Sequence, residues 1–373
     1  MGSNILSPFE LKELIKHRKN EIIITDIREV HEFNDWNIAD SINIPVNSLL
    51  VQGDYRGMKK ELCKLPKDKF IITVCMRGIN SQVISSVLNE MGYMSASLEK
   101  GMKGWNENFD VYEINFPDFV IVQFVRVGKG CLSYIIISKK STNAVLIEPS
   151  IFTSEYINYI DAHKLTLTKI LDTHAHADHF SGGMALSKET GIDYYINSAD
   201  VDGDFRFKSL LGMHEIKLDE VVINIIPTPG HTDGSLSFLI DNKALVCGDL
   251  MLLESPGRPD LARTKEDTIK GAGILFDTLH NIIFKLEESV KIFPSHFTKT
   301  ELRPVVLSLG ELKNQCKPLQ MTQKEEFIEY LTSNIPLTPP NYESIKKFNK
   351  AGAIIPMDYA EDLEIGPNRC AAR

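Results

Sequence analysis

Residues 173–179 read Thr-His-Ala-His-Ala-Asp-His and follow a short apolar run that ends at Asp172. Three imidazoles and one carboxylate within six residues cannot share one face of a helix. A turn after a strand, in contrast, can bring all four side chains to one point, and they are of the kinds that bind transition metals. The stretch therefore predicts a metal site at a strand end.

Later segments supply the same kinds of ligand, namely His231, Asp249 and His296. Each lies in a turn after a run of apolar, β-branched residues that we predict to be a strand. Half of the ten histidines thus lie at predicted strand ends beside two acidic residues, which indicates a metal centre. The other five are expected in ordinary surface or core positions: His17, His31, His163, His214 and His280.

The rest of the chain predicts two α/β domains. Strand-like runs at 21–26 and 70–74 alternate with amphipathic stretches at 9–17 and 82–91, which favours a small doubly wound domain. From Phe119 onward, successive short strands and helical segments favour an αββα sandwich with its loops at one edge. We expect domains at 1–113 and 119–373, joined by a linker at 114–118 that contains Pro117.

The composition argues against several classes of function. The chain has 373 residues, a formal charge of -9 and 43% hydrophobic residues, which disfavours a broad nucleic-acid-binding face or a polybasic membrane contact. No apolar run approaches the ~18 residues that span a bilayer, and no secretory signal is visible. Six scattered cysteines suit a reducing compartment. We expect a cytoplasmic homo-oligomer without nucleic-acid or membrane partners.

The ligand pattern resembles that of the metallo-β-lactamase superfamily, whose His-x-His-x-Asp-His motif matches 174–179. Within it, 173–182 is similar to the Thr-His-x-His-Ala-Asp-His-x-x-Gly stretch of the persulfide dioxygenases. Their Gly-Asp segment leading to Gly-Arg-x-Asp resembles 248–260, and their Leu-x-x-Pro segment resembles 337–340. The resemblance covers residues 119 to about 350 and implies the metallo-β-lactamase sandwich.

This resemblance implies one Fe(II) per chain, held by His174, His231 and Asp249 with three positions open for persulfide and O₂. Further candidate residues would support the ligands and substrate, or hold a second metal in a dinuclear zinc hydrolase of the glyoxalase II type: His176, Asp178, His179 and His296. The sequence leaves both occupancies, Fe and Zn, open.

Arg258 is the candidate anchor for a carboxylate of a thiol carrier such as glutathione, because a guanidinium can bind a carboxylate through two hydrogen bonds. An exposed loop arginine is the alternative. Related glutathione-using enzymes have an aromatic hydroxyl just after the last histidine, whereas this chain has Phe297 and Thr298. The thiol carrier is therefore left open.

Cys75 follows the predicted strand 70–74 and opens a loop that leads into a predicted helix. A thiol at this place faces backbone N–H groups and a helix N-terminus, which favours the thiolate. An inert buried cysteine is the alternative. Packing roles are expected for Cys63, Cys131, Cys247 and Cys316, and an incidental role for Cys370.

Residues 7 to about 110 resemble a rhodanese domain. Asp26-Ile27-Arg28, the Asn-Ile-Pro at 43–45 and the closing Leu98 to Trp105 stretch match that family, and the loop from Cys75 has the sulfurtransferase length. The resemblance implies that Cys75 carries a persulfide and that Arg77 supplies positive charge. Three positions depart from the family pattern: Asn37, Asn80 and Lys100.

Together these features predict an enzyme of persulfide metabolism. The iron part would oxidise a low-molecular-weight persulfide with O₂ to sulfite and thiol, and the rhodanese part would exchange sulfane sulfur with thiosulfate or sulfite. One alternative is a dinuclear zinc thioester hydrolase with an accessory rhodanese domain. A second is a non-catalytic sulfur carrier or sensor, in which Cys75 stores persulfide.

Overall fold

The structure is a computed structural model that describes residues 4–261, 264–297, 303–333, 335 and 337–369. The chain divides into two compact units. The first unit comprises Met1–Asn108, Arg126–Lys129 and Ile365–Pro367, and the second comprises Phe109–Val125, Gly130–Glu364 and Asn368–Arg373. Within the described residues, no helix is both long and apolar enough to cross a membrane.

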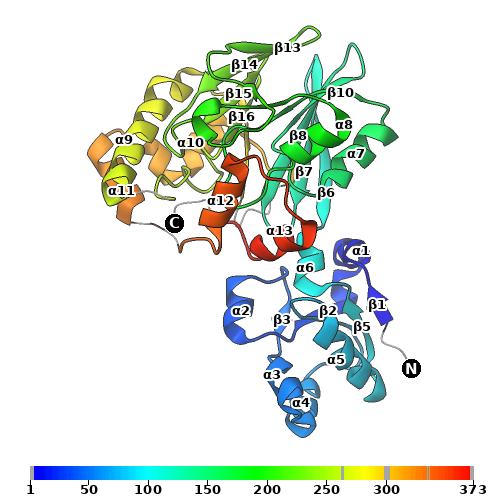
Figure 1. Ribbon diagram of the computed structural model, residues 1–373. Coiled ribbons are helices and arrows are strands. Elements are labelled where there is room, and N and C mark those ends of the chain that lie inside the picture. The colour runs from blue at the N-terminus through cyan, green and yellow to red at the C-terminus, as the bar shows by residue number, and fades with distance from the viewer. Residues whose placement is uncertain (1–3, 262–263, 298–302, 334, 336, 370–373) are drawn as a thin grey trace. The chain divides into compact units, whose positions relative to one another are not determined.

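The first unit is a parallel sheet with helices on both faces (Figure 1). Its strands follow the order β1-β5-β4-β2-β3 and are β1 (Asn4–Leu6), β2 (Ile22–Asp26), β3 (Ile42–Asn43), β4 (Phe70–Val74) and β5 (Met94–Leu98). Its helices are α1 (Pro8–Arg18), α2 (Val30–Asp35), α3 (Asn47–Gln52), α4 (Tyr55–Leu62), α5 (Ile79–Glu90) and α6 (Gly101–Asn106).

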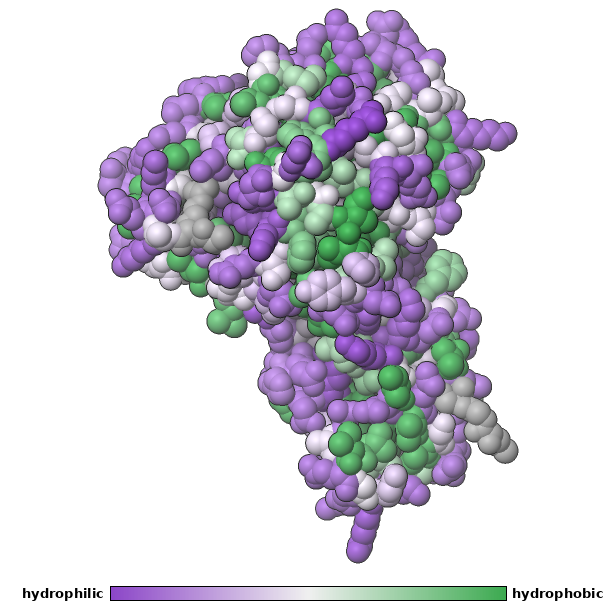
Figure 2. Space-filling model, in the orientation of Figure 1, coloured by the Kyte–Doolittle hydropathy of each residue, from purple (hydrophilic) through white to green (hydrophobic). Residues whose placement is uncertain are grey.

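The central strand β4 shows why this sheet needs helices on both sides. Ile71 packs into one apolar cluster with Ile84 of α5, whereas Ile72 and Val74 pack into another with Leu11 of α1. Successive side chains of a strand point to opposite faces, so an apolar run is stable only when both faces are covered. Figure 2 shows apolar residues at the surface over α5 as well.

The second unit is a sandwich of two sheets flanked by helices. The seven-stranded sheet, in the order β12-β11-β10-β9-β8-β7-β6, consists of β6 (Phe109–Asn115), β7 (Phe119–Arg126), β8 (Cys131–Ser138), β9 (Asn143–Ile147), β10 (Thr166–Leu171), β11 (Tyr194–Ile196) and β12 (Lys208–Ser209). The six-stranded sheet, in chain order, consists of β13 (Glu215–Leu218), β14 (Val221–Pro227), β15 (Leu236–Ile240), β16 (Ala244–Gly248), β17 (Lys291–Pro294) and β18 (Leu307–Ser308).

Apolar side chains hold the layers together. Residues of both sheets, such as Tyr134 and Phe238, share one large cluster, and Leu275 of a helix joins it. Tyr156 and Leu186 cover the outer face of the seven-stranded sheet. The helices of this unit are α7 (Thr153–Ala162), α8 (Gly183–Thr190), α9 (Lys265–Asn281), α10 (Leu309–Gln315), α11 (Lys324–Ser333), α12 (Tyr342–Lys350) and α13 (Met357–Leu363). The predicted αββα arrangement is confirmed (Figure 1).

The division between the units falls earlier than the expected linker. Phe109–Asn115 is strand β6 of the second unit, and the Phe116 N–H donates to the Phe119 carbonyl at 2.9 Å. The residues 114–118 therefore include the end of one strand and the turn into the next. Pro117 is compatible with a turn between neighbouring strands, so its presence did not distinguish a turn from a linker.

Candidate metal centre and cysteine loop

The candidate metal ligands lie on loops that follow strands of both sheets of the second unit. His174 follows β10, His231 follows β14, Asp249 follows β16 and His296 follows β17. Gly248 permits a close approach of two of these loops, because its φ is +56° and a Cβ there would lie 2.5 Å from the side-chain oxygen of the residue before His174. All four candidate ligands are buried.

His174, His231 and Asp249 form the first cluster, in which one ligand atom from each residue lies within 4.8 Å of the others. The Asp249 Oδ2 lies 3.4 Å from the His231 Nε2 and 4.0 Å from the His174 Nε2. The structure thus brings together the three residues that the sequence predicts as one ligand set.

Hydrogen bonds orient both imidazoles of the first cluster. The His231 Nδ1 lies 2.7 Å from the Arg258 carbonyl oxygen, so Nδ1 must carry the proton and Nε2 keeps its lone pair. The His174 Nδ1 contacts the Thr173 hydroxyl at 2.8 Å, and its buried Nε2 makes no hydrogen bond to the described residues. Burial lowers the pKa of His174 well below its usual range. Neutral, oriented imidazoles beside a carboxylate fit a divalent metal ion.

A second cluster lies next to the first. One ligand atom from each of its members lies within 4.8 Å of the others, and the members are Cys131, Asp178, His179 and His296. Asp249 reaches toward it, because the Asp249 Oδ1 lies 3.2 Å from the His296 Nε2. Three of these residues were predicted to lie together. Cys131 was expected to be a packing residue, but its Sγ lies 3.6 Å from the Asp178 Oδ2.

His176 faces a carboxylate that sequence reasoning missed. Its Nε2 lies 3.3 Å from the Glu148 Oε2, and Glu148 also accepts hydrogen bonds from the Thr173 N–H at 2.6 Å and from the Ser295 hydroxyl. Burial opposes both charges, but the Glu148 carboxylate raises the pKa of His176 to about 10, and the His176 charge lowers the pKa of Glu148 to about 2. The available signal was an acidic residue directly after an apolar strand.

Arg258 is not placed as the sequence led us to expect. Its side chain is buried, and its guanidinium donates to both oxygens of Asp260 at 2.8 and 2.7 Å and to the carbonyls of Leu337 and Arg369. Neither expected alternative, a substrate-facing anchor or an exposed loop residue, describes these contacts. The Arg258 carbonyl instead orients His231.

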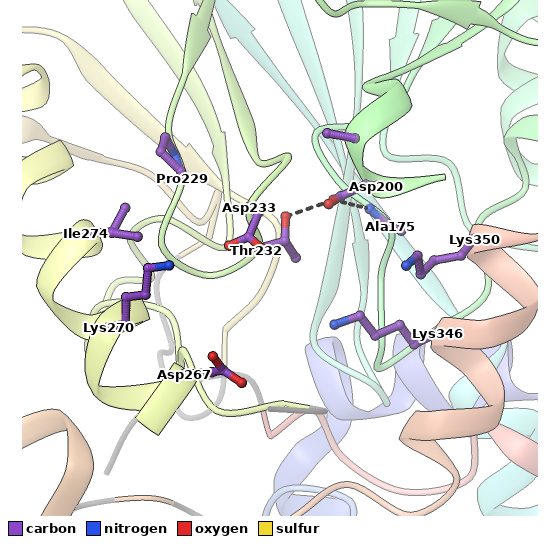
Figure 3. A pocket seen from close by; sticks show the side chains of 11 residues that line it. Ala175, Asp200, Pro229, Thr232, Asp233, Asp267, Lys270, Ile274, Lys346 and Lys350 are labelled. Atoms are coloured by element: carbon purple, nitrogen blue, oxygen red, sulfur yellow. Dashed lines mark hydrogen bonds between the residues drawn. The ribbon is translucent and has the colours of Figure 1, made fainter. Parts of the chain in front are cut away.

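Asp200 joins the two histidine-bearing loops and was also missed. Its Oδ2 accepts hydrogen bonds from the Ala175 N–H at 3.1 Å and the Thr232 hydroxyl at 2.8 Å (Figure 3). Its Oδ1 accepts from the Gly234 N–H at 3.1 Å. Asp200 lies in no recognisable motif. Its only sequence signal is its position in the Asn-Ser-Ala-Asp turn after a short strand.

Asp200, Ala175 and Thr232 line a cavity of about 610 Å³. Lys270 of α9 lies on one wall, and Lys346 and Lys350 of α12 lie on the other (Figure 3). Two of the lining residues, Ala175 and Thr232, are each next in sequence to a residue of the first cluster. The cavity therefore places ammonium groups close to the loops that carry His174 and His231.

Side chains from the C-terminal part of the chain complete the loop at 174–181. The Asn349 side-chain amide donates to the carbonyls of His176 and His179, both at 2.8 Å, and accepts from the Ser181 N–H at 3.0 Å. The Asn368 amide donates to the Asp178 Oδ2 at 2.6 Å, and the Glu364 carboxylate accepts from the backbone N–H of residue 180. The bonds of Asn349 and Glu364 satisfy backbone groups that no strand or helix pairs, and that of Asn368 holds a carboxylate of the loop.

In the first unit, Cys75 lies at the end of β4 and lines a cavity of about 250 Å³. Its carbonyl accepts from the Met102 N–H at 2.9 Å, which turns this part of the backbone toward α6. Gly101 makes that approach possible, because a Cβ there would lie 2.1 Å from the Cys75 carbonyl oxygen. The Ser81 hydroxyl donates to the Cys75 Sγ at 3.2 Å and receives a hydrogen bond from the Ser97 hydroxyl at 2.8 Å.

Arg77 and Asn80 also line this cavity, so the structure brings the predicted cysteine and arginine to one site. The Asn80 side-chain amide donates to the Asn47 side-chain oxygen at 2.8 Å. Lys100, a departure from the family pattern, has a positive φ of 54° and an ion pair with Glu107 at 2.9 Å. Thr298 and Cys370 lie outside the described residues.

Comparison with known proteins finds similarity to a protein named as a zinc-dependent hydrolase and to one named as a persulfide dioxygenase. The chain is 27% identical over 202 residues to the probable polyketide biosynthesis zinc-dependent hydrolase BaeB of Bacillus velezensis, which covers 53% of this chain and 85% of that protein. It is 25% identical over 223 residues to the mitochondrial persulfide dioxygenase ETHE1 of Bos taurus, covering 58% and 83% respectively.

A crystal structure of a metallo-beta-lactamase from Staphylococcus aureus superposes with a TM-score of 0.59 at 25% identity, covering 64% of this chain and 74% of that one. Residues 7–108 match the rhodanese-like domain family, and residues 126–296 match the metallo-beta-lactamase superfamily. The chain therefore consists of an N-terminal rhodanese-like domain followed by a domain of the metallo-β-lactamase superfamily.

Proposed function

We propose that the second domain oxidises a low-molecular-weight persulfide, such as glutathione persulfide, while the first domain exchanges sulfane sulfur through Cys75. The oxidation is R–S–SH + O₂ + H₂O → R–SH + sulfite + two protons. Similarity to a protein named persulfide dioxygenase supports this proposal. The main structural observation behind the proposal is the first cluster, in which two imidazoles and one carboxylate lie together.

This ligand set suits Fe(II) better than a closed zinc site, because a two-histidine, one-carboxylate face leaves positions for substrates. Bound Fe(II) would supply the site at which O₂ and the terminal sulfur of the persulfide meet. The protein's part is to hold His174 through Thr173 and His231 through the Arg258 carbonyl. Burial of the ligands keeps bulk water away from this site.

The cavity beside the first cluster is the proposed binding place for the carrier part of the persulfide. Arg258 is bound to Asp260, whereas three lysines line the cavity and could contact an anionic carrier: Lys270, Lys346 and Lys350. Carboxylates or phosphates of the carrier would pair with these ammonium groups. The volume of about 610 Å³ is within the range of small-molecule sites.

In the rhodanese-like domain, the Cys75 thiolate would attack the outer sulfur of thiosulfate. The S–S bond of thiosulfate breaks, sulfite leaves, and Cys75 becomes a persulfide. Run in reverse, the same exchange consumes sulfite, the product of the second domain. The proposed chemistry of the two domains is thus linked through sulfite, which the second domain releases and the first domain can consume.

The test is metal content of anaerobically purified protein together with O₂ uptake on adding glutathione persulfide. About one iron per chain, O₂ consumption that depends on persulfide and release of sulfite are expected. Two zinc ions per chain without O₂ uptake, even after reconstitution with iron, would contradict the proposal.

The second candidate function is a dinuclear zinc thioester hydrolase. The adjacent second cluster favours it, as does similarity to a protein named as a zinc-dependent hydrolase. That function needs a water molecule between two metals and therefore an open position on each. Thioester hydrolysis by zinc-loaded protein, without O₂ uptake, would distinguish it.

A further inference from the structure

We propose that Asn349 is a positioning residue that couples occupation of the cavity beside the first cluster to the geometry of the loop at 174–181. This inference deepens the proposed function and rests on it for one point, namely that the cavity takes the carrier part of the substrate. The coupling joins two neighbouring sites of the second unit, and it acts through a helix that contributes no candidate metal ligand.

Asn349 holds the loop through three hydrogen bonds at once. Its amide nitrogen donates to the carbonyls of His176 and His179, both at 2.8 Å, and its amide oxygen accepts from the Ser181 N–H at 3.0 Å. An amide side chain suits this set, because the two carbonyls need donors and the N–H needs an acceptor. The backbone geometry of the loop therefore depends on where the side chain of Asn349 lies.

The helix that carries Asn349 also forms one wall of the cavity. Lys346 and Lys350 of α12 line the cavity, and Asn349 lies between them in sequence (Figure 3). Residues three and four apart are neighbours on the surface of a helix, so Asn349 and Lys350 both lie about one turn from Lys346. Any shift of α12 thus moves the lysines of the cavity wall together with the amide that holds the loop.

The packing of α12 gives it a direct contact with the same loop. Ile345 of α12 belongs to a small apolar cluster, whose other buried members among the described residues are Phe180 and Ala360. The rings of Phe180 and Phe348 lie with their centroids 6.0 Å apart. Elements with few buried apolar contacts open at a lower free energy than core strands. We therefore expect α12 and the loop to become ordered together.

These contacts predict positive coupling between the metal and the carrier. A metal ion bound through His174 would fix the start of the loop, and the loop would in turn hold Asn349 and the two lysines of α12. The carrier would then bind a helix that is already ordered, so it would lose less entropy and bind more tightly. By linkage, the carrier must strengthen metal binding by the same factor, which is typically about 5–150-fold.

The experiment titrates S-methylglutathione into Co(II)-loaded and metal-free protein, with the full chain in both cases, by isothermal titration calorimetry. The blocked sulfur of this probe cannot bind the metal as a thiolate. We expect binding to the loaded wild type to be tighter by at least about fivefold, and the ratio of the two affinities to fall to about one in Asn349→Ala. Lys347→Ala is the matched control, because Lys347 is an exposed residue of α12 that does not line the cavity; it should keep the wild-type ratio.

Equal affinities of the two wild-type forms would overturn the inference. So would an unchanged ratio in Asn349→Ala, because direct attraction between the metal charge and the carrier would then account for the coupling. If Asn349→Ala fails to fold, hydrogen exchange of the wild type decides instead. Metal loading should slow exchange of the α12 amides by at least about fivefold and leave those of α10, which does not line the cavity, unchanged. Equal exchange of α12 with and without metal would contradict the coupling.

Failure of this inference can be told apart from failure of the proposed function. Absence of S-methylglutathione binding to both forms would contradict the carrier site and the inference together. Absence of persulfide-dependent O₂ uptake would contradict only the proposed function, because the affinity ratio and the exchange rates do not depend on turnover.

Discussion

The Thr232 hydroxyl donates to the Asp200 carboxylate at 2.8 Å, and the same oxygen of Asp200 accepts from the Ala175 N–H. One buried side chain thus connects the loop of His231 to the loop of His174. The spacing of these two candidate metal ligands depends on a residue that is not itself a candidate ligand. Such support is worth about 10–100-fold in metal affinity at known sites.

Replacing Asp200 with Ala should therefore weaken metal binding at the first cluster by about 10–100-fold. It should also lower the free energy of unfolding by about 1–3 kcal/mol, because the Ala175 and Gly234 N–H groups lose their acceptor. Competitive metal titration and urea unfolding would measure the two effects. Asp202→Ala is the control, because its exposed side chain contacts only Lys350 among the ion pairs described; unchanged affinity in Asp200→Ala would refute the prediction.

The two proposed activities should separate by mutation. His174→Ala or Asp249→Ala is expected to abolish persulfide-dependent O₂ uptake and to leave sulfur transfer from thiosulfate intact. Cys75→Ser should do the reverse when preformed persulfide is supplied. O₂ electrode traces and a thiocyanate assay would measure the two reactions. Loss of both activities in a folded single variant would show that the sites are not independent.

The cavity lysines should affect substrate binding rather than turnover. Lys270→Ala and Lys346→Ala are expected to raise KM for glutathione persulfide by about three- to tenfold, with little change in kcat, because a lost ion pair removes uniform binding. Lys217→Ala is the control, since Lys217 lies on β13 and does not line the cavity. A fall in kcat at unchanged KM would indicate a different role for these side chains.

Ser81 should determine the reactivity of Cys75. A hydrogen bond to a charged group contributes about 1.5–3 kcal/mol, so Ser81→Ala should slow alkylation of Cys75 at neutral pH by about tenfold or more. Ser85→Ala is a matched control: Ser85 lies one turn along α5 and contacts Ser95 of β5 at 3.1 Å, yet it does not touch the thiol. Equal alkylation rates in the two variants would exclude the Ser81 contribution.

The Glu148–His176 pair should give the metal-free protein a bounded pH range of stability. The lowered pKa of Glu148, about 2, adds stability above the unfolded value of 4.5 that is lost as the pH falls toward 2. The raised pKa of His176, about 10, adds stability below 6.5 that is lost as the pH rises toward 10. Unfolding in urea across this range should show both losses, and Glu148→Gln should flatten the profile.

Local patterns predicted the fold and the candidate ligand string, because each depends on neighbours in sequence. The strand at 70–74 was predicted to the residue, and the strand predicted at 21–26 begins one residue later, as Ile22–Asp26. The ligand string at 174–179 was recognisable because its members are adjacent. Asp200 and Glu148 were missed, since their roles arise from contacts with loops far away in the chain.

Arg258, in contrast, was singled out from the sequence, but its contacts were not predicted. Its motif was recognised, but sequence spacing could not reveal that Asp260, two residues away, would occupy its guanidinium. Cys131 was assigned to packing because a lone buried cysteine is usually a packing residue. The pairing of its backbone with His296 shows that the thiol lies beside three candidate metal ligands.

The hydrogen bonds from Asn349, Glu364 and Asn368 also have a consequence for biosynthesis. During translation the loop at 174–181 leaves the ribosome long before these side chains exist, since Asn368 and Asp178 are 190 residues apart. Until synthesis passes residue 368, the loop has buried groups without their final partners. The loop therefore reaches its complete set of hydrogen bonds only after synthesis has passed residue 368.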